Sequence, residues 1–196
     1  MKDTKSYLSK IVQDMPDSGI KDFFDVANTM EGALSLGVGE PDFPTPEHVR
    51  EAAIASIKKG DTKYTDNRGT VELRAAAADY LTKFDLHYDK QDEILITMGA
   101  SEGIDLALRT LVNPGEEVLV AEPSYVSYIP CIELCGGVPV SLKLRAENKF
   151  RLTREQLEEK ITEKSKVLLI SYPNNPTGAI MEKEDLEAIA EVVNCL

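Results

Sequence analysis

The chain has 196 residues, 42% of them apolar and 29% charged, an ordinary composition for a soluble protein with a substantial core. Its 34 acidic and 22 basic residues give a net charge of −12, which argues against nucleic acid or an anionic membrane as a partner of the whole chain. No apolar run approaches the length of a membrane span, and the N-terminal residues lead into no apolar signal core. The expected location is therefore the cytoplasm.

Residues 1–45 are expected to be irregular. Short helices are predicted over 6–13 and 21–30, a short strand over 34–36, and a Gly- and Pro-rich loop over 37–46.

From residue 46 the pattern becomes regular. Pro46 in a first helical turn predicts a helix that runs through Lys59 and ends at Gly60. A second helix, from about 70 to 84, carries an apolar stripe.

After these two helices, strands and helices alternate, which predicts a mostly parallel sheet with covering helices. The strands are expected over 94–97, 117–121, 138–142 and 167–171, and the helices over 101–111, 124–135, 153–161 and 183–194. In the helix at 153–161, Thr153 is expected to be the N-cap, with Gln156 three residues on.

The last helix has no capping residue, Gly or Pro at its end, and its apolar face still includes Leu196. An α/β unit of this kind normally continues into another strand, so we expect the chain to be the front part of a longer protein.

The three cysteines, Cys131, Cys135 and Cys195, form no evident disulfide framework. Cys131 and Cys135 are one helical turn apart but have no further Cys or His nearby, and the two histidines, His48 and His87, have no ligand spacing. We interpret the cysteines as structural thiols and expect no metal site.

The segment Tyr172-Pro173-Asn174-Asn175-Pro176-Thr177-Gly178 directly follows an apolar strand. Ligands of α/β proteins bind at the carboxyl ends of strands. The prolines stiffen this loop, while Asn174 and Asn175 add side-chain donors and acceptors at a fixed place. Alone, the segment fits a turn as well as a ligand loop.

Other strand ends carry further polar groups. The segment 98–103 joins a strand to a helix with small residues and a Ser hydroxyl, which suits either an anion or a simple N-cap. Tyr125, after the next strand, can stack on a flat ring or pack beneath a loop. A glycine loop at 37–43 and a polar turn at 63–69 complete the set. The glycines of the loop at 37–43 and of the segment 98–103 do not have the spacing of a dinucleotide-binding motif.

In order and spacing, these segments resemble the class I aminotransferases, which are pyridoxal-phosphate enzymes of fold type I related to aspartate and aromatic aminotransferases. The matching segments are Ser35–Phe43, Lys63-Tyr64, Gly99-Ala100-Ser101, Pro123-Ser124-Tyr125 and Asn174–Gly178. The segment Ser18–Phe24, which includes Ile20, is similar to a bacterial branch acting on aspartate, aromatic or acetylated diaminopimelate substrates.

The resemblance implies an α/β fold, the three-layer αβα sandwich of the fold type I large domain, truncated and with an irregular N-terminal segment. Residues 1–45 would belong to the small domain and the substrate-side loop. Residues 46–196 would form the first part of the pyridoxal-phosphate-binding large domain, incomplete at its C-terminus.

The resemblance also implies roles for single residues. Ala100 and Ser101 would hold the cofactor phosphate, and Tyr125 would stack on the pyridine ring, where many relatives use Trp. Asn175 would bond the ring hydroxyl oxygen and help to place the substrate carboxylate. The cofactor is pyridoxal 5'-phosphate, which carries the electron-sink chemistry.

Three further residues complete the implied site. Gly39 and Ile20 would lie on the substrate side, and Tyr64 would reach the partner's phosphate in a homodimer. The substrates would be an amino acid and a 2-oxo acid.

The family's Schiff-base lysine and its substrate-binding arginine would follow residue 196, so no catalytic residue is assigned within the chain. The spacing Ser56-x-x-Lys59 resembles a lysine motif, but it occupies a last helical turn, where cations suit the helix end. The chain alone is therefore expected to be inactive.

Two alternatives stay open. The chain could be a non-catalytic unit that binds a phosphate ligand or a partner chain. It could also belong to a pyridoxal-phosphate lyase or decarboxylase on the same fold, because the choice of reaction depends on residues after 196.

Overall fold

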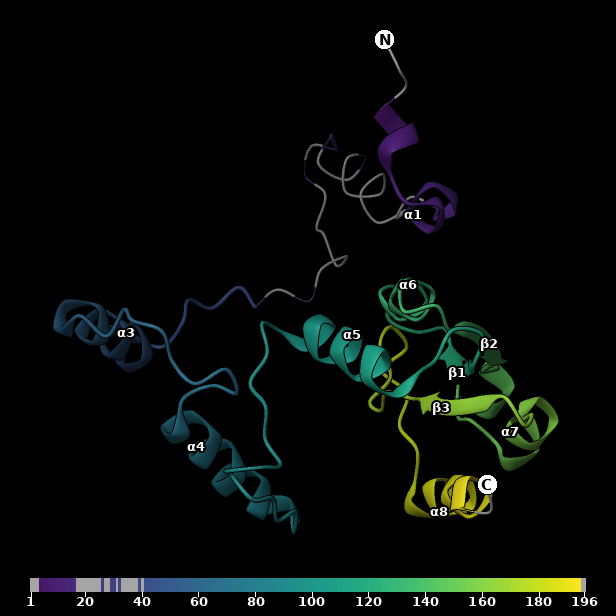
Figure 1. Ribbon diagram of the computed structural model, residues 1–196. Helices are drawn as coiled ribbons and strands as arrows, with labels where there is room; N and C mark the ends of the chain where they lie inside the picture. The colour runs from purple at the N-terminus through teal and green to yellow at the C-terminus, as the bar shows by residue number, and fades with distance from the viewer. Residues whose placement is uncertain are drawn as a thin grey trace. The chain divides into compact units, whose positions relative to one another are not determined.

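A computed structural model describes residues 4–16, 26, 29–30, 32, 39 and 41–194 (Figure 1). The chain separates into two compact units, residues 18–97 and residues 1–17 with 98–196. The boundary predicted between residues 45 and 46 separates the small-domain segment from the large domain, not these two compact units, and it stays a prediction. The predicted helix at 21–30 and strand at 34–36 lie outside the described residues, apart from isolated positions.

Two α-helices of the unit 18–97 lie wholly within its described part. They are α3 (Glu47–Lys59) and α4 (Val71–Leu81), the latter extended by the 3-10 helix η2 (Thr82–Phe84). Gly60 ends α3 with φ of 86°, a left-handed conformation that glycine adopts without strain. Thr70 caps α4 by accepting a hydrogen bond from the Leu73 N–H. Both predicted helices are confirmed.

A buried arginine holds this unit together. Arg74 is 0% exposed, and its guanidinium donates to the carbonyl oxygens of Lys90, Gln91 (3.0 Å) and Gly69 (3.2 Å). Asp66 lies 3.9 Å from it. The planar guanidinium carries five N–H donors, so one side chain can join the turn at Gly69 to the adjacent residues Lys90 and Gln91.

The unit formed by 1–17 and 98–196 is a three-layer αβα structure. Its strands β1 (Glu117–Glu122), β2 (Val138–Lys143) and β3 (Ser165–Leu169) form a parallel sheet in the order β2-β1-β3. The helices are η1 (Thr4–Tyr7), α1 (Lys10–Asp14), α5 (Ala100–Leu111), α6 (Tyr128–Leu134), η3 (Ala146–Asn148), α7 (Arg154–Lys160) and α8 (Lys183–Asn194).

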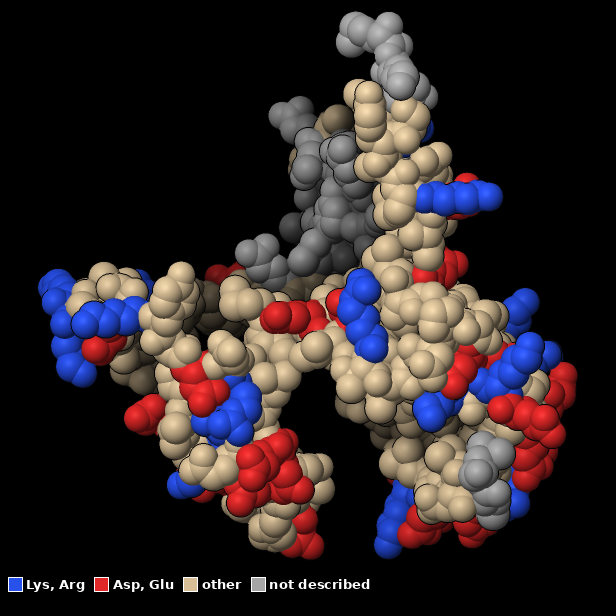
Figure 2. Space-filling model, viewed as in Figure 1, with Lys and Arg blue, Asp and Glu red and all other residues tan. Residues whose placement is uncertain are grey.

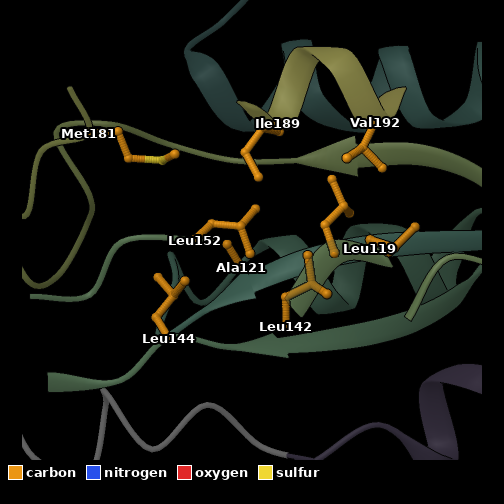
Figure 3. Packing of buried hydrophobic residues seen from close by; sticks show 9 residues of the cluster. Leu119, Ala121, Leu142, Leu144, Leu152, Met181, Ile189 and Val192 are labelled. Carbon is orange, nitrogen blue, oxygen red and sulfur yellow. The ribbon is translucent and has the colours of Figure 1, made fainter. Parts of the chain in front are cut away.

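Helices cover both faces of the sheet, as Figure 1 shows. Leu119 and Ala121 of β1 belong to a core with Leu157 of α7 and with α8, which Figure 3 shows from close by. Val118 and Val120 belong to a second core, with Leu108 of α5 and with α6. Successive strand residues point to opposite faces, so one apolar run supplies both cores.

The capping and charge pattern of α7 follows the sequence closely. Thr153 and Gln156 form the expected reciprocal capping box. Arg154 then pairs with Glu158 at 2.7 Å and with Glu191 of α8 at 2.8 Å. Lys, Arg, Asp and Glu side chains accordingly intermix over the surface of α7 and α8 (Figure 2).

The prediction of a strand at 94–97 is wrong. The structure has no strand there, and the Ile96 N–H donates to the Arg68 carbonyl at 3.0 Å instead. An apolar run becomes a strand only when a neighbouring strand completes its hydrogen-bond ladder. None of the three described strands pairs with this segment.

Two boundaries also differ from prediction. Helix α6 begins at Tyr128 rather than at 124, so Tyr125 lies in a loop. Strand β3 begins at Ser165 and ends at Leu169, two residues earlier than expected, with an irregularity in its pairing near Glu117 and Val118. Both shifts lengthen the polar segments that follow the strands.

Within the residues that the structure describes, no helix is long and apolar enough to cross a membrane. Over the same residues, no group of three or more His, Cys, Asp or Glu side chains is placed to hold a metal ion. Cys131 and Cys135 are free and partly buried against the second core, and burial raises the pKa of the Cys131 thiol. Cys195 lies outside the described residues.

Candidate functional site

The first component of the site is the N-terminus of α5. Gly99 precedes the helix with φ of 83°, and Ala100 and Ser101 occupy the exposed first turn. The first N–H groups of a helix have no carbonyl partner within the helix, and the helix dipole adds partial positive charge there. Because of these N–H groups and this partial charge, the end of α5 is suited to an anion such as a phosphate. Just before the helix, the Glu102 carboxylate accepts a hydrogen bond from the Met98 N–H.

Tyr125 lies in the loop between β1 and α6, against the same helix end. Hydrogen bonds with the Ser127 and Ser101 hydroxyls lower the pKa of the Tyr125 phenol. Its half-buried ring packs edge-to-face on Tyr128, with the ring centroids 5.7 Å apart. The Ser101 interaction therefore makes this aromatic ring a neighbour of the first turn of α5.

The third component is the loop after β3. Asn175 is exposed, whereas Asn174 is only 5% exposed. The Asn174 amide nitrogen donates to the Pro123 carbonyl at 3.2 Å, which links this loop to the one that carries Tyr125. Three predicted groups, the helix end, the ring and the amide, therefore belong to connected segments.

The other predicted site residues belong to other parts of the chain. Tyr64 and Gly39 belong to the unit 18–97, where both are exposed. Ile20 lies outside the described residues. Lys59 is at the end of α3 and pairs with Asp61 at 3.3 Å, which is an ordinary surface role.

Sequence reasoning did not assign a role to Asn174. The adjacent pair Asn174 and Asn175 was a signal in the sequence, because a simple turn does not require two side-chain amides. Only the structure shows that one amide is buried and bonded within the protein while its neighbour is exposed.

The N-terminus of α5, an aromatic ring and an exposed amide follow strands of a parallel sheet, and the carboxyl ends of such strands are where α/β domains bind ligands. Comparison with known proteins gives the family. Residues 31–195 match the family described as aminotransferase class I and II. The chain belongs to this family.

Proteins of this family that are similar to the chain include the putative aminotransferase YugH of Bacillus subtilis, 49% identical over 95% of the chain. The aromatic-amino-acid aminotransferase 2 of Thermococcus litoralis is 44% identical over 94% of the chain. The chain covers 48% of each of these two proteins. It thus spans about half the length of the curated relatives it matches.

Solved structures agree with this assignment. The crystal structure of aspartate aminotransferase from Thermotoga maritima has a TM-score of 0.90 at 35% identity, over 96% of this chain and 51% of that one. An aromatic aminotransferase from Pyrococcus horikoshii has a TM-score of 0.81 at 40% identity, over 89% and 46% of the two chains. The expected fold, part of a fold type I large domain, is confirmed.

Proposed function

We propose that the chain is part of a pyridoxal-phosphate-dependent aminotransferase, which transfers an amino group from an L-amino acid to a 2-oxo acid. The aspartate and aromatic aminotransferases among its relatives support substrates of those kinds. The observation that carries the proposal is the 3.2 Å hydrogen bond from the Asn174 amide to the Pro123 carbonyl, because it joins the loop of the exposed Asn175 amide to the loop of the Tyr125 ring.

The residues present fit this cofactor. Ala100 and Ser101 offer N–H groups and a hydroxyl to the phosphate, and Tyr125 offers its ring to the pyridine. The exposed Asn175 amide can donate to the ring hydroxyl oxygen and to a substrate carboxylate. When bound, pyridoxal phosphate supplies the electron sink on which amino-group transfer depends.

The remaining assignments belong to the same proposal. Gly39 and Ile20 contribute to substrate binding, and the exposed ring of Tyr64 reaches the phosphate of the partner subunit in a cytoplasmic homodimer. The Schiff-base lysine is supplied by sequence after residue 196.

The test is to mix the whole protein with pyridoxal phosphate and a panel of amino acids plus 2-oxoglutarate. The expected result is a change in cofactor absorbance with stoichiometric formation of glutamate. Release of carbon dioxide or ammonia without glutamate would identify a decarboxylase or lyase. Failure to bind the cofactor at all would favour a non-catalytic unit.

A further inference from the structure

The two adjacent asparagines after β3 have opposite environments. Asn175 is exposed, whereas Asn174 is 5% exposed and bonds to protein through both its amide nitrogen and its amide oxygen. A buried carboxamide is stable only when both its donor and its acceptor are bonded. The question is what the bonds of Asn174 hold in place.

The acceptor end of Asn174 shapes its own loop. Its Oδ1 accepts from the Thr177 hydroxyl at 2.8 Å and from the Thr177 N–H at 3.2 Å. Its backbone N–H donates to Ala179 at 2.8 Å, and its carbonyl accepts from Gly178 at 2.8 Å. Asn175 therefore occupies a short loop closed on both sides of it.

The donor end reaches a different loop. The Asn174 Nδ2 donates to the carbonyl of Pro123, two residues before Tyr125 and 51 residues away in sequence. Pro123 follows the last residue of β1, Glu122. A single side chain thus connects the loops that follow two neighbouring strands.

We propose that Asn174 is a positioning residue that fixes the exposed amide of Asn175 relative to the ring of Tyr125. This inference rests on the proposed function. Asn174 is buried and therefore does not contact a ligand itself. It acts through Asn175 and Tyr125, which contact the ligand in the proposed function. An aspartate in its place keeps the acceptor but presents a second oxygen to the Pro123 carbonyl, which breaks the link between the loops.

The test compares two ligands in the whole protein. The first, 4'-deoxypyridoxine 5'-phosphate, has the ring and the phosphate but no aldehyde, so its binding needs no lysine. The second, inorganic phosphate, occupies only the α5 end. Both dissociation constants are measured by calorimetry for the wild type, for Asn174→Asp and for Asn148→Asp, a matched control with an exposed amide in η3.

The expected result is a roughly tenfold weaker binding of the ring ligand by Asn174→Asp, as for one lost hydrogen bond, with inorganic phosphate unchanged. The control variant binds both ligands as the wild type does. Thr177→Val, which removes the 2.8 Å bond to Asn174, gives a smaller loss of the same kind, whereas Thr177→Ser preserves binding. These milder variants decide the matter if Asn174→Asp does not fold.

A double variant shows whether Asn174 acts through its neighbour. In Asn174→Asp combined with Asn175→Ala, the loss should be less than the product of the two single losses, because the residues share one function. Equal weakening of both ligands, or reduced stability with unchanged ring binding, would overturn the inference while leaving the proposed function intact. A wild-type protein that binds neither ligand would remove the proposed function, and this inference with it.

Discussion

At the scale of single residues, the structure distinguishes exposed polar side chains at the candidate site from buried polar side chains that bond to the protein. Asn175 and Ser101 are exposed at the candidate site, whereas Asn174 and Arg74 are the buried polar side chains in the described part of the chain. The buried pair joins backbone segments that are distant in sequence.

We expect Asn175→Ala to leave the fold intact and to impair catalysis in the whole enzyme. The variant loses a hydrogen bond to the charged cofactor, which costs about 1.5–3 kcal/mol, and hence about ten- to a hundredfold in kcat/KM. Steady-state kinetics and the cofactor absorbance spectrum measure the effect, with Asn148→Ala as a control at an exposed amide. Wild-type turnover with an unchanged spectrum would show that the loop is only structural.

Arg74→Ala is expected to destabilise the unit 18–97 by about 2–3 kcal/mol, because three backbone carbonyls lose a charged donor that belongs to a buried side chain. Urea unfolding followed by circular dichroism measures the change. Arg68→Ala is the control: Arg68 also bonds the Gln91 carbonyl, but its side chain is half exposed, so a smaller loss is expected. Equal losses in the two variants would argue against a special role for burial.

At the scale of elements, each strand depends on its neighbours. β1 pairs on both sides and its central residues are buried, whereas the apolar segment 94–97 has no ladder at all. Both segments are apolar runs in the sequence, but only β1 has neighbouring strands with which to pair.

Hydrogen exchange should reveal this difference. Amides of β1 are expected to be strongly protected, since opening them requires loss of both cores, and amides at 94–97 to exchange orders of magnitude faster. Mass spectrometry of peptides from the two regions makes the comparison within one sample. Similar protection at 94–97 and in β1 would mean that the segment is held by a partner strand after all.

These elements also show which features of the fold and the candidate site could be predicted from the sequence. Caps and stops of helices are local, so Gly60, Thr70 and the Thr153–Gln156 box were predictable, and the motifs at Ser101, Tyr125 and Asn175 indicated the site. The prediction of a strand at 94–97 was wrong because strand pairing depends on residues that are distant in the sequence. The burial of Asn174 could not be foreseen, since its partner Pro123 lies 51 residues away.

At the scale of the whole molecule, apolar surface is unusually exposed. No residue of α3 is buried, and Ile54 and Ile57 are 51% and 67% exposed. β3 is at an edge of the sheet and pairs on one side only. Surfaces of both kinds favour association.

We therefore expect the 196-residue chain to associate as its concentration rises. Sedimentation velocity should show an increasing average mass, and Ile57→Lys should reduce it by replacing an exposed apolar side chain. Ala55→Lys adds the same charge to the same helix and serves as the control. A compact monomer at high concentration, equally in all three proteins, would contradict this expectation.

The same chain is expected not to transaminate, because it spans about half the length of its relatives and Lys59, its one candidate Schiff-base lysine by spacing, has a surface role. Borohydride treatment in the presence of pyridoxal phosphate, followed by peptide mass spectrometry, should find no single modified lysine. A specific adduct together with turnover would refute the prediction.

The division of the chain has a consequence for proteolysis. Residues 1–17 group with 98–196, so the unit 18–97 is an insertion whose two ends join the same folded body. No residue of η1 or α1 is buried, so covalent linkage holds this N-terminal segment at a high effective concentration beside α6. A single cut within 18–97 would remove that linkage, and two fragments of one chain would then have to find each other by diffusion.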